Sequence, residues 1–204
     1  MKQLLIVVEG SLDIDFIRDF ITVNFSNKIL NSHYAIQKSG GFTTLHLMKQ
    51  SFDFNTKNGG KNLILFDADS ADNDGGYSKR KQYIEKVISD KSINSDIFLF
   101  PNNQDDGDLE TLLCSIINPT HEDIFKCWDV YEQCLKSKNP RYTLPARKTK
   151  VSAYLEALLG RTQSEKKKID LNRDYKITDH WNLNHQNLSN LKTVIEKCFN
   201  ELST

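Results

Sequence analysis

Four short apolar runs recur in the first hundred positions, and a longer segment of mixed character follows each of the first three. The first run, LLIVV at 4–8, does not alternate apolar with polar residues, which is typical of a central strand covered on both faces. The next segment places Leu12, Phe16, Phe20 and Val23 at helical spacing. We predict strands at 4–8, 33–37, 62–66 and 96–100, and helices at 12–25, 43–50 and 77–89.

Strands that alternate with helices in this way predict an α/β protein, with a Rossmann-like parallel sheet of about four strands and helices on both faces. The pattern changes after Pro101, where helical periodicity predominates. We expect further helices at 108–116, 121–135, 151–159, 165–168 and 188–202. The chain then divides into an α/β core, 1–116, and a mostly helical extension, 117–204, packed on the same domain.

The balance of charges excludes a general attraction to polyanions. Lys and Arg together number 27 among the 204 residues, and so do Asp and Glu. A chain without net charge has no global field that draws in nucleic acid or a membrane surface. Binding of a polyanion would therefore depend on a local cluster of basic residues.

The cysteines and the N-terminal residues indicate in which cellular compartment the protein is expected. The four cysteines form no CxxC pair, and the first apolar run is too short for a signal peptide before Glu9 interrupts it. No segment approaches the roughly 20 apolar residues of a membrane span. We expect a cytoplasmic protein with reduced thiols and no membrane partner.

Acidic side chains follow two of the predicted strands. Glu9 comes directly after the first strand, and Asp67 and Asp69 come directly after the third. In open parallel sheets, ligands bind at the carboxyl ends of the strands. Neighbouring carboxylates share a proton or bind a cation, and hard oxygen ligands suit Mg²⁺ or Mn²⁺. Asp13 lies four residues after Glu9, on the same side of the first helical turn.

Three known arrangements of paired acids fit this chain poorly. A calcium loop that starts at Asp67 would need an acid at its fifth position and glycine at its sixth, where the chain has Ala71 and Asp72. A haloacid-dehalogenase-like phosphotransferase has its DxD motif on the first strand. A receiver-type phospho-acceptor has adjacent acids there, whereas this chain has Glu9 followed by Gly10.

The sequences EGSLD at 9–13 and DAD at 67–69, each after a predicted strand, resemble the Toprim domain. That domain is shared by topoisomerases, DnaG-type primases, small maturation nucleases and the overcoming-lysogenization-defect (OLD) nucleases. Further stretches, at 100–113, 148–155 and 180–183, are similar to segments of a Toprim-like family of unknown function related to the OLD nucleases. The resemblance covers most of the chain.

The resemblance implies metal-dependent hydrolysis of phosphodiesters in nucleic acid, with a role in defence against phage or mobile elements. It implies two Mg²⁺ or Mn²⁺ ions, as in other two-metal sites. Lys148 or Lys150 would support the transition state, and Glu9 is also expected to be catalytic. The metal ligands would be Glu9, Asp67 and Asp69 for one ion, with Asp13 and Glu110 for the other.

Two departures from the OLD pattern shape the expected partners. The chain carries no ATPase domain, so we expect an ATPase or other protein partner to supply any energy coupling or targeting. It also carries no tyrosine in a recognisable topoisomerase cleavage module, which disfavours strand passage.

A basic segment offers the local cluster that nucleic acid would need. Residues 136–150 contain six basic residues and no acid. Basic side chains can contact phosphates, and a tyrosine among them can stack on a base. We expect a nucleic-acid partner, with DNA favoured over RNA. The expected contact residues are Arg141, Tyr142, Arg147, Lys148 and Lys150.

Two other functions stay open on the sequence. One is a non-catalytic Toprim-like module that binds metal and a nucleotide or nucleic acid to regulate a partner. The other is a metal-dependent phosphatase that acts on a small substrate.

Overall fold

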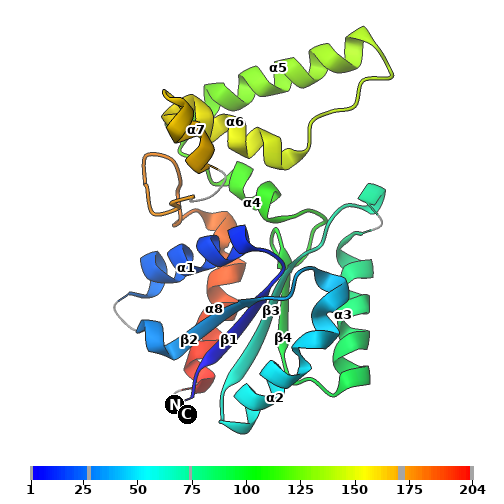
Figure 1. Cartoon of the computed structure of the whole chain (residues 1–204), viewed down its shortest axis with the longest axis vertical. Helices are drawn as coiled ribbons and strands as arrows, with labels where there is room; N and C mark the ends of the chain where they lie inside the picture. The colour runs from blue at the N-terminus through cyan, green and yellow to red at the C-terminus, as the bar shows by residue number, and fades with distance from the viewer. Residues whose placement is uncertain (1, 27–28, 74, 170–172, 203–204) are drawn as a thin grey trace.

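A computed structural model describes the chain over residues 2–26, 29–73, 75–169 and 173–202. Its four strands form one parallel sheet in the order β2-β1-β3-β4, which confirms the predicted α/β class (Figure 1). Val8 lies opposite Leu65, and Asp67 lies opposite Phe100. The strands are β1 (Leu4–Val8), β2 (Tyr34–Lys38), β3 (Lys61–Asp67) and β4 (Asp96–Phe100).

The central strand β1 is buried on both faces, as its unbroken apolar run predicts. Leu4, Ile6 and Val8 belong to one apolar core, and Leu5 and Val7 belong to a second core on the opposite face. The first core also takes side chains from helices that include α1 (Ser11–Phe25), α4 (Leu109–Ser115) and α8 (Ser189–Leu202).

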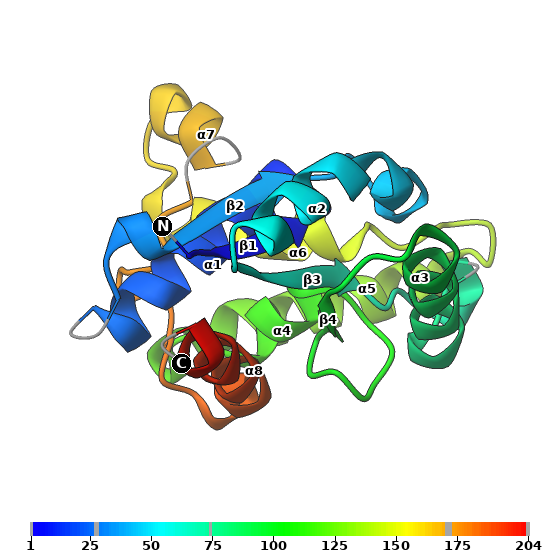
Figure 2. The same ribbon diagram turned by 90° about the horizontal axis from the view of Figure 1, so that it is seen from below.

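The second core is covered by two helices that lie on the other side of the sheet, as Figure 2 shows from below. The chain reaches each of them through a 3₁₀ segment. One pair is η2 (Phe42–Met48) and α2 (Lys49–Lys57), and the other is η3 (Ala71–Asn73) and α3 (Tyr77–Lys91).

The rest of the extension lies beyond the carboxyl ends of the strands (Figure 1). Its aromatic side chains continue the first core, because the rings of Tyr154 and Trp181 lie 5.4 Å apart and those of Phe16 and Tyr175 lie 5.3 Å apart. The extension and the sheet therefore share one core. Its helices, besides α8, are α5 (Glu122–Lys138), α6 (Arg147–Leu159) and α7 (Gln163–Ile169), and its 3₁₀ segments are η4 (Pro119–His121) and η5 (Gln186–Leu188).

Two of the predicted helices differ most from the structure at their ends. The helix expected at 43–50 begins as the 3₁₀ segment η2 and continues as α2 to Lys57, because Phe52 reaches the second core through an otherwise polar stretch. The helix expected at 151–159 begins at Arg147, directly after the extended residue Ala146. The end of the basic segment is therefore helical.

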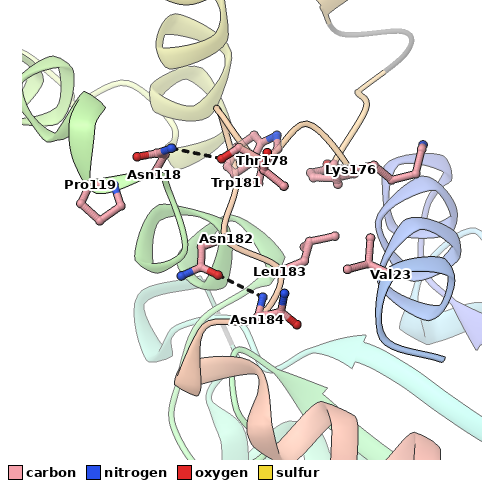
Figure 3. A pocket seen from close by; sticks show the side chains of 10 residues that line it. Val23, Asn118, Pro119, Lys176, Thr178, Trp181, Asn182, Leu183 and Asn184 are labelled. Carbon is pink, nitrogen blue, oxygen red and sulfur yellow. Dashed lines mark hydrogen bonds between the residues drawn. The ribbon is translucent and has the colours of Figure 1, made fainter. Parts of the chain in front are cut away.

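A half-open groove of about 190 Å³ lies where the extension meets α1 (Figure 3). Val23 lines it from α1, and Asn118, Thr178 and Trp181 line it from the extension. The Asn118 amide donates a 3.0 Å hydrogen bond to the carbonyl of Thr178. That amide therefore holds two loops of the extension together.

None of the described helices is both long enough and apolar enough to span a bilayer.

Candidate active site at the carboxyl edge of the sheet

A hydrogen bond joins the ends of the two central strands. Glu9 follows β1, and its Oε1 accepts the backbone N–H of Asp67, the last residue of β3, at 3.1 Å. Burial raises the pKa of Glu9 to about 7, although the bond from Asp67 and the charge of Arg80 act in the opposite direction. A carboxyl group that titrates near neutral pH at a strand end is characteristic of a functional site.

Asp67 lies among other acids. Burial raises its pKa well above the usual range, and the negative charges of Asp13 and Glu9 raise it further. Its Oδ1 accepts the N–H of Leu109 at 2.9 Å, which ties the end of β3 to the start of α4. The sequence places these acids on separate segments, and the parallel register brings them to one edge.

Asp13 and Glu110 complete the group. The Oδ2 of Asp13 accepts the N–H of Gly10 at 2.8 Å, and burial raises the pKa of this carboxyl group. Burial also raises the pKa of Glu110, in the first turn of α4, and the charge of Asp108 adds to that effect. We call Glu9, Asp13, Asp67 and Glu110 the acid cluster.

Asp69 faces a different partner. Its backbone is left-handed, with φ of 58°, and its carboxylate forms an ion pair with Arg80 of α3. The guanidinium of Arg80 stacks 3.3 Å from the ring centre of Phe42, and its side chain is only 4 % exposed. The second acid of the DAD sequence is therefore paired with a fixed cation in this structure.

Arg147 reaches the edge of the acid cluster from the extension. It forms an ion pair of 2.7 Å with Asp108, the residue that caps α4. A groove of about 350 Å³ begins here, and its lining includes Thr111, Arg147 and Lys150. Arg147 is thus the member of the basic segment that the structure brings next to the acids.

Of the other predicted nucleic-acid contacts, Lys150 lines the same groove but pairs with a different acid. Lys150 forms an ion pair of 2.6 Å with Asp129 of α5, and its ammonium lies 4.8 Å from the ring centre of Phe125. Lys148, Arg141 and Tyr142 are exposed.

Arg173 is a buried cation that sequence reasoning missed. Its side chain is 5 % exposed, it donates a 3.2 Å hydrogen bond to Ser152, and its charge lowers the pKa of Glu110. No motif surrounds this arginine in the sequence. Its buried position is a product of the tertiary fold.

The donor chemistry of the acid cluster suits a hard divalent ion, because its carboxylates are partly buried and their pKa values are raised. Among the residues that the structure describes, however, no three His, Cys, Asp or Glu side chains come close enough together to hold a metal ion. To bind an ion, the carboxylate side chains of the acid cluster would have to rotate so that at least three of them come within bonding distance of it.

The comparisons with known proteins identify a family. A family model described as "Protein of unknown function (DUF3226)" matches residues 3–200. Searches of the curated proteins and of the solved structures found no match.

Proposed function

The chain belongs to this family of unknown function, and we propose that it hydrolyses phosphodiester bonds of nucleic acid with a divalent metal ion at the acid cluster. The meeting of four carboxylates at the carboxyl edge of the sheet, where burial raises the pKa of each, is the observation that carries this proposal. Burial and mutual repulsion disfavour several negative charges at one edge. A divalent cation relieves both effects, and it competes with protons for the carboxylates.

The acid cluster would hold Mg²⁺ or Mn²⁺ through Glu9, Asp13, Asp67 and Glu110. A bound ion supplies activation of water and stabilisation of the leaving oxygen. The Oε1 of Glu9 accepts the N–H of Asp67, so Oε2 is the atom that would accept a proton from the attacking water.

Two arginines would act on the phosphodiester. Arg147 is partly exposed beside Asp108, where a substrate phosphate could exchange with that carboxylate. Arg173 is buried near Glu110 and would offset charge that develops on the phosphate. Lys148 and Lys150 remain candidates for the same role, and Lys150 would first have to leave Asp129.

The substrate strand would follow the groove of about 350 Å³ away from the acids. Its lining includes the basic Arg147 and Lys150 together with one acid, Glu132. We retain DNA as the favoured substrate over RNA, an ATPase or other protein as the partner, and the cytoplasm as the compartment.

The direct test is cleavage of labelled single-stranded DNA, plasmid DNA and RNA with Mg²⁺ or Mn²⁺. We expect cleavage by the parent protein and its loss in Asp67→Asn, which keeps the shape of the side chain but removes its charge. Asp123→Asn changes an exposed aspartate of α5 and serves as the matched control, with activity retained. Cleavage that persists in Asp67→Asn would contradict the assignment.

A non-catalytic module that binds metal and a nucleotide or nucleic acid is the second candidate. It is favoured by the lack of a closed three-ligand group among the described side chains and by the pairing of Asp69 with Arg80. Mn²⁺-dependent binding of oligonucleotides without cleavage on any of the three polymers would support it. Turnover of a small phosphate ester, with no cleavage of polymers, would instead indicate a phosphatase.

A further inference from the structure

Arg80 is a buried positive charge built into the edge of the acid cluster. It projects from α3, its side chain is 4 % exposed, and its guanidinium lies flat against Phe42 at 3.3 Å. A buried guanidinium needs a carboxylate partner, because desolvation of an unpaired charge is costly. Asp69 provides that partner.

The backbone of Asp69 is fixed by its neighbours. Its N–H donates to the carbonyl of Gly107 at 2.6 Å, and its own carbonyl accepts the N–H of Gly107 at 2.8 Å. Asp69 can therefore turn toward the acid cluster only by rotation of its side chain. That rotation would leave Arg80 buried without its carboxylate partner.

Asp69 pairs with the guanidinium of Arg80. The carboxylates of Glu9, Asp13 and Asp67 instead accept backbone N–H groups. Charge is therefore unevenly distributed along this edge of the sheet. Arg80 neutralises Asp69, whereas negative charge accumulates at Asp13, Asp67 and Glu110.

We infer that Arg80 takes the place of a second metal ion, so that the edge binds one divalent ion and Asp69 is not among its ligands. This inference rests on the proposed function, and it differs from the two ions that the sequence resemblance implies. Arg80 is then a positioning residue. It holds Asp69 away from the ion and reduces the net negative charge that the ion must balance.

The test counts the Mn²⁺ ions that bind to the purified chain. Isothermal titration calorimetry measures the binding, and the electron paramagnetic resonance signal of free Mn²⁺ gives an independent count. We expect one ion per parent chain. Asp67→Asn should weaken binding by about tenfold or more, whereas Asp69→Asn should change it less than about threefold. Two ions per parent chain, or equal losses in the two variants, would overturn the inference while leaving the proposed function intact.

A parent chain that binds no Mn²⁺ would overturn the proposed metal site together with the inference. The count on the parent chain needs no variant, so it decides the question even if Asp69→Asn fails to fold. Arg80→Met should add a second, weaker Mn²⁺ site by releasing Asp69. Lys81→Met is the matched control, because this neighbouring cation contacts Tyr77 instead, and its variant should still bind one ion.

Discussion

The backbone N–H of Asp67 donates to Oε1 of Glu9 at 3.1 Å and thereby joins the ends of two neighbouring strands through one carboxylate. The bond fixes that oxygen at the edge of the sheet, in surroundings that raise the pKa of Glu9 to about 7. Strand pairing thus determines where Glu9 lies, and burial determines the pH at which its carboxyl group ionises.

Glu9 should make the metal-free protein less stable as pH rises. Its pKa is about 7 in the folded protein against 4.5 for an unperturbed glutamate, so the folded state binds more protons than the unfolded state between these pH values. Stability then falls as pH increases through that window. In EDTA, Glu9→Gln should flatten the fall and add on the order of 2 kcal/mol to the free energy of unfolding at pH 8.

Urea unfolding at several pH values measures this effect. Glu85→Gln, at an exposed position on α3, is the control and should behave as the parent does. An unchanged pH profile in Glu9→Gln would mean that Glu9 ionises normally in the folded chain.

Mn²⁺ should stabilise the chain, and more so at pH 8 than at pH 6, because the ion competes with protons for the acid cluster. At about 100 times the dissociation constant the gain is about 2.7 kcal/mol. Thermal unfolding with Mn²⁺ against EDTA measures it, and Asp67→Asn should abolish most of the gain. An equal gain in the parent and in this variant would place the ion elsewhere.

Asp69 and Arg80 should be strongly coupled in stability. Asp69→Asn keeps a side chain that tolerates the left-handed backbone but leaves Arg80 without its carboxylate, at a cost of about 3 kcal/mol. Combining it with Arg80→Met should cost less than the sum of the two single changes. For comparison, Asp53→Asn breaks a partly exposed pair with Lys49 and should cost less than about 1 kcal/mol. Additive losses in urea unfolding would show that the buried pair contributes nothing specific.

Arg147 should contribute to nucleic-acid binding through phosphate contact. Arg147→Gln should weaken binding of single-stranded DNA and lower the slope of log affinity against log salt concentration by about 1. Fluorescence anisotropy over a series of salt concentrations measures both. Arg161→Gln, at an exposed position after α6, should leave the slope unchanged. Equal slopes in all three proteins would remove Arg147 from the interface.

Asp19 should fasten the extension to α1. Its carboxylate is buried, and it accepts the N–H of Tyr175 at 2.9 Å and the ammonium of Lys176 at 2.8 Å. Asp19→Ala should therefore cost about 2 to 3 kcal/mol, and urea unfolding should show it. Asp15→Ala breaks an ion pair with Arg18, whose side chain is half exposed, and should cost far less.

The sheet could be predicted from the sequence because four short apolar runs separated by helical segments leave few other arrangements. Parallel strands bring Glu9 and Asp67 to the same edge, but their contact also requires β1 and β3 to be neighbours, and the sequence alone does not establish that strand order. The orientation of Asp69 does not follow from the sequence either, because it depends on the left-handed backbone at Asp69 and on a ring at Phe42 that holds Arg80. These contacts join three segments, and no local pattern encodes them.

The contribution of the extension was harder to predict for the same reason. Arg173 reaches the acids from a stretch without a motif, and its position depends on how that loop packs against α6. Lys150 stands in a basic run, but α6 begins at Arg147 and so directs Lys150 toward Asp129. The basic composition of the run does not specify that Arg147 pairs with Asp108 and Lys150 with Asp129.

The ion pair of 2.8 Å between Lys61 and Glu201 closes α8 against the start of β3, at the opposite end of the sheet from the acids. The start of β1 lies at that same end, as Figure 1 shows. A seven-residue strand such as β3 is roughly 20 Å long, so a dye attached to Lys61 would stand about that far from Asp67. Labels for single-molecule measurement can therefore be attached at this end of the sheet without obstructing the acid cluster.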